Sequence, residues 1–173
     1  MTAFGFGGAG SSQITQDEID ESTPFVAAGD GDLNLLKASL EHLNMPLSKP
    51  DENGFTICHA AAAYNHVHIL QWIISEAGES VAAIVNAQDT DGDTPLHHCD
   101  KVEAAQTLIR EGRANYTLKN NAGQTALQLK QDDFEEAVGG DDDDNIDDIF
   151  IDEIVELKEL IDYLKEFSTT NPQ

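Results

Sequence analysis

Residues 57–74 carry the clearest hydrophobic pattern in the chain. Apolar side chains recur at helical spacing on both sides of a short polar corner, Tyr64-Asn65-His66. They are Ile57, Ala60, Ala61, Ile69, Leu70, Trp72, Ile73 and Ile74. This pattern predicts two helices that fold back on each other at the corner. The small side chains of Ala60-Ala61-Ala62-Ala63 let a neighbouring helix approach the first of them closely.

A second amphipathic helix is predicted over residues 149–167. Its apolar side chains fall at steps of three and four, at Phe150, Ile154, Leu157, Ile161 and Leu164. Its acidic side chains Asp152, Glu153, Glu156 and Glu159 are expected to face water. Such a helix can close the end of a stack, because one face is apolar and the other is polar.

A short phrase precedes the first helix pair and recurs downstream. It reads Asp51-Glu52-Asn53-Gly54-Phe55-Thr56-Ile57-Cys58-His59 and then Asp89-Thr90-Asp91-Gly92-Asp93-Thr94-Pro95-Leu96-His97. The first aspartate can accept hydrogen bonds from nearby N–H groups, and the glycine can take a left-handed conformation. The threonine can cap a helix, which Pro95 would then begin. The phrase therefore predicts a turn followed by a helix start.

The phrase resembles the ankyrin repeat, in which an Asp-x-x-Gly-x-Thr-Pro-Leu-His sequence makes a turn and opens the first of two antiparallel helices. The resemblance implies an all-α solenoid of about four helix-turn-helix repeats. Degenerate copies lie at residues 26–37 and 120–127. In the third repeat the first helix should lose nearly a turn. Extra residues around 78–85 should lengthen the second helix of the second repeat or the loop after it.

These patterns predict one ankyrin-repeat domain over residues 17–167. Its repeats are expected at about 22–48, 49–86, 87–117 and 118–167. Residues 1–16 are rich in glycine and are predicted to form a flexible tail, and residues 168–173 a C-terminal tail. Within the last repeat, residues 139–148 are predicted to be a disordered acidic insertion, because they combine very low apolar content with strong self-repulsion.

The charge pattern narrows the choice of partner. Of 33 acidic residues, 16 lie between Asp132 and Glu166, where only Lys158 and Lys165 oppose them, so this segment carries −14 of the formal net charge of −24. Like-charge repulsion makes nucleic acid and anionic membranes poor partners. A basic protein is favoured. We expect a monomer. No signal peptide or membrane span is present, which favours an intracellular location. No basic localisation run is present either, but a chain of 18.8 kDa is small enough that both the cytoplasm and the nucleus stay open.

Several side chains invite other chemistry. Histidines and Cys58 and Cys99 could suggest zinc, but no Cys-x-x-Cys pair exists, and His59, His66 and His97 fall on ankyrin positions. Asp89, Asp91 and Asp93, like residues 141–152, imitate a calcium loop without matching its full pattern. No catalytic motif is found, so we expect no metal, no cofactor and no enzyme activity. His98 is the one histidine that the repeat pattern leaves unexplained.

The resemblance implies that the turns and the exposed edge of each first helix form a concave protein-binding surface. Position by position, this gives the residues Glu52, Asn53, Phe55, Ala63, Tyr64, Thr90, Asp91, Asp93, Asn121, Ala122 and Gln124. Phe55 and Tyr64 are expected to matter most, since aromatic side chains are common at binding hot spots.

The predicted function is a non-catalytic adaptor that binds a basic protein. A second hypothesis is an acidic escort chaperone, similar to small fungal ankyrin proteins that shield a basic ribosomal protein. A third, assembly chaperoning for the proteasome, rests on the fold alone.

Overall fold

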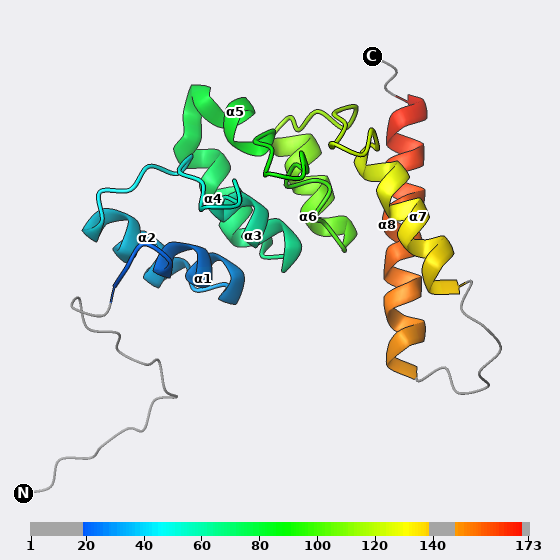
Figure 1. Cartoon of the computed structure of the whole chain (residues 1–173), viewed down its shortest axis with the longest axis horizontal. Coiled ribbons are helices and arrows are strands. Elements are labelled where there is room, and N and C mark those ends of the chain that lie inside the picture. Colours follow the sequence, from blue (N-terminus) through cyan, green and yellow to red (C-terminus); the bar gives the residue numbers. More distant parts are fainter. Residues whose placement is uncertain (1–18, 139–147, 171–173) are drawn as a thin grey trace, which may run out of the picture.

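The computed structural model describes residues 19–138 and 148–170. Its helices form an elongated row, with the N-terminal pair at one end and α7 and α8 at the other (Figure 1). In chain order they are α1 (Thr23–Asp30), α2 (Leu33–His42), α3 (Ile57–Ala63), α4 (Val67–Ala77), α5 (Val81–Val85), α6 (Val102–Gln106), α7 (Ala126–Val138) and α8 (Asp148–Thr170). The described residues hold only one isolated β-bridge, between Lys119 and Thr125. The all-α solenoid is therefore confirmed.

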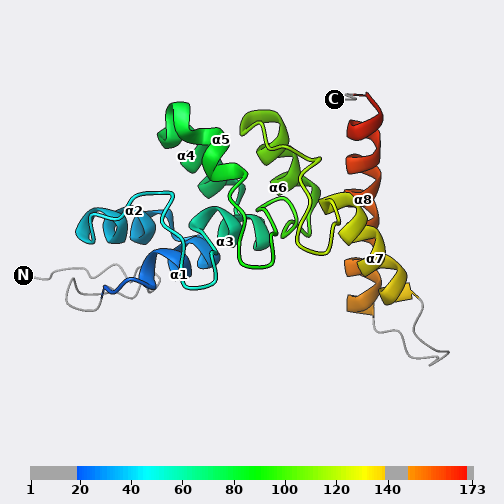
Figure 2. The same cartoon turned by 45° about the horizontal axis from the view of Figure 1, so that its top comes forward.

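The helices form two layers. Figure 2 shows α1 and α3 on the side of the turns, with α2, α4 and α5 on the opposite side. Small side chains lie where helices approach closely, and Ala27, Ala28, Ala60, Ala61, Ala62, Ala104 and Ala105 are all buried. Larger apolar residues fill the space between the layers, including Leu36, Ile69, Leu70, Ile73 and Leu108. Each helix pair thus buries one face against its neighbour, as stacked repeats do.

Three turns share one internal geometry. The Asp51 carboxylate accepts hydrogen bonds from the backbone N–H groups of Asn53 and Phe55, both at 2.8 Å. In the other two turns the acceptor is the side-chain oxygen of Asp89 or Asn120. The glycines Gly54, Gly92 and Gly123 all have φ between 77° and 82°. The predicted turns are confirmed, and asparagine replaces aspartate in the last of them without loss of the bonds.

Successive turns also bond to each other. The N–H of Thr90 donates to the Asn53 carbonyl at 2.8 Å, and the N–H of Asn121 donates to the Asp91 carbonyl at 2.9 Å. This contact is close. A Cβ atom on Gly54 would lie 2.9 Å from Asp89 Cα, and one on Gly92 would lie 2.7 Å from the Asn121 nitrogen. The first two glycines are therefore needed for the packing between turns as well as for their own φ angles.

The third repeat departs further from the pattern than the sequence indicated. Residues 95–98 form a single turn, and no α-helix lies between Thr94 and α6. The expectation of a helix shortened by nearly one turn is corrected, and the expected four complete helix pairs become three pairs and one reduced repeat. Only six residues, 95–100, separate Thr94 from Lys101 at the start of α6. In the second repeat, α3 and the corner after it occupy residues 57–66, so six residues are too few for both.

Two polar contacts bridge this shortened repeat. The Asn65 side-chain oxygen accepts a hydrogen bond at 3.0 Å from the Ala104 N–H, in the first turn of α6. From the other side, the Lys130 ammonium of α7 donates to the Asp100 carboxylate at 2.9 Å. Lys130 has a side chain only 8% exposed. The neighbouring repeats therefore hold the corner that an inner helix would otherwise fill.

The extra residues between the second and third repeats form a separate element. A 3-10 turn, η2 (Gly78–Ser80), leads into α5. Ile84 and Val85 of α5 are buried, and the Asn86 side chain accepts a hydrogen bond at 2.7 Å from the Asn115 N–H. The insertion thus lengthens neither α4 nor a plain loop. It adds a short helix that packs against the third repeat.

Helix α8 closes the stack as predicted. Leu160, Ile161 and Leu164 are buried, while Asp152, Glu153 and Glu159 are exposed. Glu156 departs from the expectation, because it is partly buried and pairs with Lys101 at 3.0 Å. The helix runs to Thr170, so residues 168–170 belong to α8 and not to the tail assigned to them. The hydroxyl groups of Thr169 and Thr170 donate to the Glu166 carbonyl.

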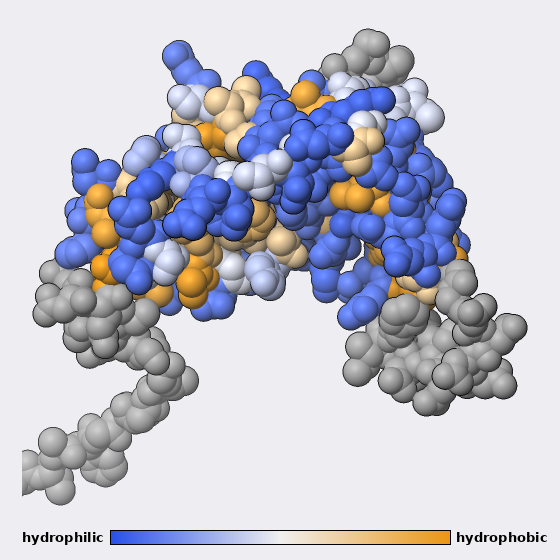
Figure 3. Space-filling view, viewed as in Figure 1, coloured by the Kyte–Doolittle hydropathy of each residue, from blue (hydrophilic) through white to orange (hydrophobic). Residues whose placement is uncertain are grey.

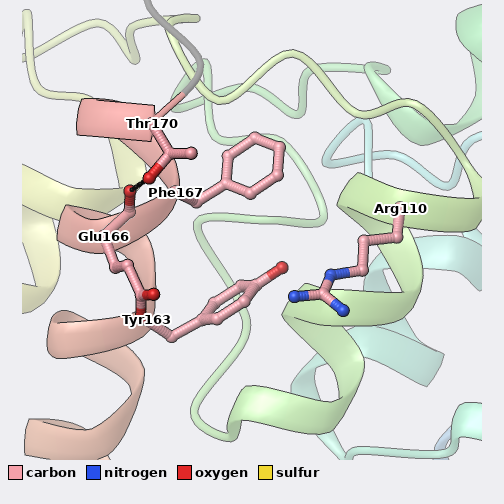
Figure 4. A pocket seen from close by; sticks show the side chains of 5 residues that line it. All are labelled: Arg110, Tyr163, Glu166, Phe167 and Thr170. Atoms are coloured by element: carbon pink, nitrogen blue, oxygen red, sulfur yellow. Dashed lines mark hydrogen bonds between the residues drawn. The ribbon is translucent and has the colours of Figure 1, made fainter.

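Aromatic packing joins α8 to the outer layer of the third repeat. There a π-helical turn, η3 (Thr107–Glu111), continues α6. Its Arg110 guanidinium lies over the Tyr163 ring, 5.7 Å from the centroid. Figure 4 shows the Tyr163 hydroxyl pointing toward Arg110 at the edge of a hollow of about 290 Å³. This hydroxyl is buried and has no hydrogen-bond partner.

The glycine-rich tail and most of the acidic insertion lie outside the described residues. The prediction for residues 1–16 falls within residues 1–18, and the prediction for 139–148 falls almost entirely on 139–147. In the part of the chain that the structure describes, no helix has both the length and the apolar character needed to cross a membrane.

The turn contacts predict different costs for two glycine substitutions. Gly92→Ala and Gly123→Ala both force alanine into a left-handed conformation, at about 1–2 kcal/mol. Only Gly92 has a neighbouring backbone that the new Cβ would strike. We expect Gly92→Ala to lower the free energy of unfolding by at least about 1 kcal/mol more than Gly123→Ala, as measured by urea denaturation. Equal losses would show that the turns do not stack as closely as described.

The buried Tyr163 hydroxyl generates a second prediction. Tyr163→Phe removes an unpartnered polar atom and keeps the ring over which Arg110 lies. We expect the free energy of unfolding to stay unchanged or to rise by up to about 1 kcal/mol. The control Tyr163→Leu loses the ring and should destabilise the protein. A clear loss of stability in Tyr163→Phe, measured by urea denaturation, would mean that the hydroxyl has a partner.

Candidate protein-binding surface

The turns present a row of small and acidic side chains. Glu52, Asn53, Thr90, Asp91 and Ala122 are exposed at the tips of the three turns. The backbone beneath them is fixed by the hydrogen bonds within and between turns. A row of exposed side chains on a rigid backbone is suited to binding another protein, because little conformational entropy is lost on association.

Other predicted binding residues have structural roles as well. The Asp93 carboxylate accepts a hydrogen bond from the Asn120 side chain at 2.9 Å. The Asn121 side chain donates to the Thr90 carbonyl at 2.9 Å, and the Gln124 side chain donates to Asp132. The bonds of Asp93 and Asn121 link the third repeat to the fourth, whereas the bond of Gln124 lies within the fourth. All three side chains are engaged in hydrogen bonds. They are less available to a partner than the residues at the turn tips.

The two aromatic candidates differ in exposure. Tyr64 ends α3 and is 67% exposed. Ala63 beside it is partly buried. Phe55 is partly buried, because its ring packs edge to face against His98 at 5.2 Å between centroids and lies 5.1 Å from His59. The two aromatics therefore do not form one exposed pair, and Tyr64 offers the larger free surface.

His98 has a role that the sequence analysis missed. Its Nε2 lies 2.8 Å from the Asp89 carboxylate, whose other oxygen anchors the second turn. Its ring also packs against both Phe55 and His59. Burial raises the pKa of Asp89, but the hydrogen bonds from His98, Asp93 and Asp91 outweigh that effect and lower it overall. The sequence feature that could have revealed this role is the position of His98, directly after His97 in the shortened third repeat.

His59 and His97 bridge neighbouring repeats. In each, Nδ1 accepts a hydrogen bond from the N–H of the capping threonine, Thr56 or Thr94, at 3.1 Å. Since Nδ1 is an acceptor, Nε2 carries the proton and donates to the next turn, at the Asp93 or Gln124 carbonyl. In the last turn Gln128 replaces histidine and accepts from the Thr125 N–H.

Metal binding at this cluster is not supported by the bonds. His59, Asp89 and His98 place potential ligand atoms within 4.8 Å of one another. A metal at His59 would need the free lone pair of Nε2, which is protonated and donates to Asp93. The cluster is therefore a hydrogen-bonded junction between two repeats. Within the described residues it is the sole group of this kind.

Neither cysteine is placed for chemistry. Both are free and fully buried. Burial raises the pKa of Cys58 to about 12 and raises that of Cys99 further. Reactive cysteines need an accessible thiolate, so these thiols serve as small apolar side chains.

The buried histidine predicts sensitivity to acid. Burial is the largest effect on His59 and lowers its pKa to about 4. Between pH 7 and 5 the unfolded chain protonates this residue while the folded chain does not, so stability falls with pH, by about 2 kcal/mol for this group. We expect His59→Gln, which imitates Gln128, to lose less stability over that range in urea titrations.

The matched control is His42→Gln, on the exposed end of α2. It should keep the full pH dependence of the unmodified chain. If His59→Gln also keeps it, then His59 is not the buried neutral group described.

The comparisons with known proteins agree with this geometry. A family model described as ankyrin repeats in many copies matches residues 25–74. An ankyrin repeat-containing protein of Schizosaccharomyces pombe is 38% identical over 115 residues, which is 64% of this chain and 52% of that protein. The RelA-associated inhibitor of Mus musculus is 30% identical over 59% of this chain and 12% of its own length.

Protein phosphatase 1 regulatory subunit 12A of Rattus norvegicus is 35% identical over 48% of this chain and 8% of its own length. The chain thus spans about half of the yeast relative and a small part of the two mammalian ones. The family model spans α1 to α4 and the turn between the first two helix pairs, and these residues are ankyrin repeats.

Proposed function

We propose that this chain is a non-catalytic interaction module that binds a basic protein through its turns and the exposed end of α3. The observation that carries the proposal is the combination of Tyr64, 67% exposed, with a chain of formal net charge −24. Two relatives are named as an inhibitor and a regulatory subunit, which is in keeping with a binding role. We further infer a monomer in the cytoplasm, the nucleus or both, and buried free cysteines suit a reducing compartment.

Charge and contact surface should act on different steps of binding. Long-range attraction to the acidic chain raises the association rate, and its effect weakens as salt is added. Contacts made by Tyr64 and the turn tips act after encounter and set the dissociation rate. The proposed surface includes the turn-tip residues together with Phe55, whose exposed edge lies in the same region.

An escort chaperone is the second candidate. The observation that favours it is the net charge of −14 between Asp132 and Glu166, which is large for one repeat. An escort would use that charge to keep a basic client soluble as well as to bind it. An adaptor would need the charge only for fast association.

The test begins with capture of partners from a cell extract and purification of the main basic protein recovered. Binding kinetics are then measured at several salt concentrations. We expect deletion of residues 139–148 to slow association and flatten its salt dependence. Tyr64→Ala, alone or with Phe55→Ala, should mainly speed dissociation, by about tenfold for a hot spot worth about 1.4 kcal/mol.

His42→Ala on α2 is the control and should change neither rate. Light scattering by the client separates the two candidates, because only an escort loses its protective effect when residues 139–148 are removed. If neither the deletion nor the aromatic substitutions alter binding, the proposed surface is wrong and the binding surface must lie on the outer helices.

A further inference from the structure

A recess of about 750 Å³ lies where the third repeat lacks its inner helix. The end of α3 with Tyr64 forms one wall, and the corner at Asp100 and Lys101 forms the second. The third wall is the first half of α8, including Asp152, Glu153 and Leu157. Figure 3 shows it as a notch at the lower edge of the molecule, between the helix row and the α7–α8 pair.

The recess is distinct from the row of turn tips. Tyr64 lies at the C-terminal end of α3, whereas the turns lie at its N-terminal end. The recess follows from the short segment 95–100, because an inner helix of ordinary length would extend past Lys101 into this space. Asn65 and Lys130 hold the corner from its two sides but leave the recess open.

Its lining combines apolar and acidic side chains. Ala63, Leu157 and the exposed ring of Tyr64 provide apolar surface. Asp100, Asp133, Asp152, Glu153 and Glu156 add five carboxylates. Two lysines oppose them. Lys130 is buried and is fixed between Asp100 and Asp133, whereas Lys101 is 45% exposed and pairs with Glu156 at 3.0 Å.

The Lys101–Glu156 ion pair indicates which ligands the carboxylates of the recess can bind. A half-exposed ion pair is worth about 0–1 kcal/mol, so an incoming cation can displace this lysine at little cost. Asp152 and Glu153 are exposed and are also available to such a cation. Phosphate-bearing ligands would be repelled by the carboxylates of Asp100, Asp133 and the first half of α8. An arginine side chain suits this lining best, since its guanidinium binds carboxylates in bidentate fashion and stacks on aromatic rings such as that of Tyr64.

We propose that this recess binds a short arginine- and lysine-bearing segment of the partner protein, with apolar side chains of that segment on Tyr64 and Leu157. The proposal rests on the proposed function and locates part of the contact away from the turns. It commits to a basic peptide segment as the occupant, because charge and apolar surface are both complementary to one.

The experiment uses the full chain and a fluorescein-labelled ten-residue peptide of alternating arginine and leucine. The matched probe replaces each arginine with neutral citrulline. Anisotropy is measured at 150 mM salt. We expect the arginine probe to bind at least tenfold more tightly than the citrulline probe. Asp152→Asn with Glu153→Gln should lower the affinity for the arginine probe at least fivefold, and Tyr64→Ala should lower it at least threefold.

Glu76→Gln with Glu79→Gln is the control variant. It removes the same charge from exposed positions at the end of α4 and in η2, and it should weaken binding less than twofold. Lys101→Gln should strengthen binding of the arginine probe, because it removes a competing cation. Urea denaturation of each variant checks that the fold is retained.

The outcomes separate this proposal from the broader one. If both pairs of substitutions lower the affinity for the arginine probe equally, binding follows net charge alone. The recess is then not the binding site, while a basic partner remains supported. If Lys101→Gln weakens binding, the recess is likewise overturned. If the unmodified chain does not distinguish the arginine probe from the citrulline probe, the recess and the basic-partner proposal both fail.

Discussion

The contact between successive turns is the constraint on which the rest of the structure depends. Each turn donates or accepts a backbone hydrogen bond to the next, and a histidine of the preceding repeat donates into the following turn. Gly54 and Gly92 permit this approach because they have no Cβ atom. Since a stack of repeats has no central core, the register of each helix pair is set by its neighbours. These contacts between turns fix the positions of the exposed tips.

The parts of the fold that local chemistry determines could be predicted from the sequence. Threonine caps, an aspartate anchor and a glycine at left-handed φ act within a few residues, so α3 and the turns follow from the phrase at residues 51–59. The degenerate phrase at 120–127 still gives a turn, because Asn120 offers the same acceptor oxygen as aspartate and Gln128 caps as histidine does. Substitutions that preserve the hydrogen-bonding atom preserve the structure.

The parts that depend on contacts between repeats could not be predicted in the same way. Gly78 has a φ of 53° and ends α4, but nothing within residues 78–85 determines that a helix and not a loop follows it. Helix α5 forms because Ile84 and Val85 are buried against the third repeat. The loss of the inner helix in the third repeat depends on whether Asn65 and Lys130 can satisfy its neighbours from outside. His98 belongs to the same class, since its partner Asp89 is fixed by the turn and not by local spacing. The binding role of each turn residue is also a matter of what its neighbours leave free, as Asp93 and Asn121 illustrate.

The shortened third repeat buries Leu96 and Cys99 in the core, and polar groups bridge it to the repeats on both sides. Lys130 is nearly buried, and a buried lysine requires carboxylate partners, which Asp100 and Asp133 supply. A simpler solution for stability alone would be an inner helix of normal length with apolar contacts. Local departures from the rules of folding tend to coincide with functional sites, because stability is lost there for another purpose. Here the departure opens a recess beside Tyr64 and turns the acidic half of α8 toward it. The irregular repeat and the acidic segment are therefore best understood as two parts of one surface, in which the missing helix supplies the space and α8 supplies the charge.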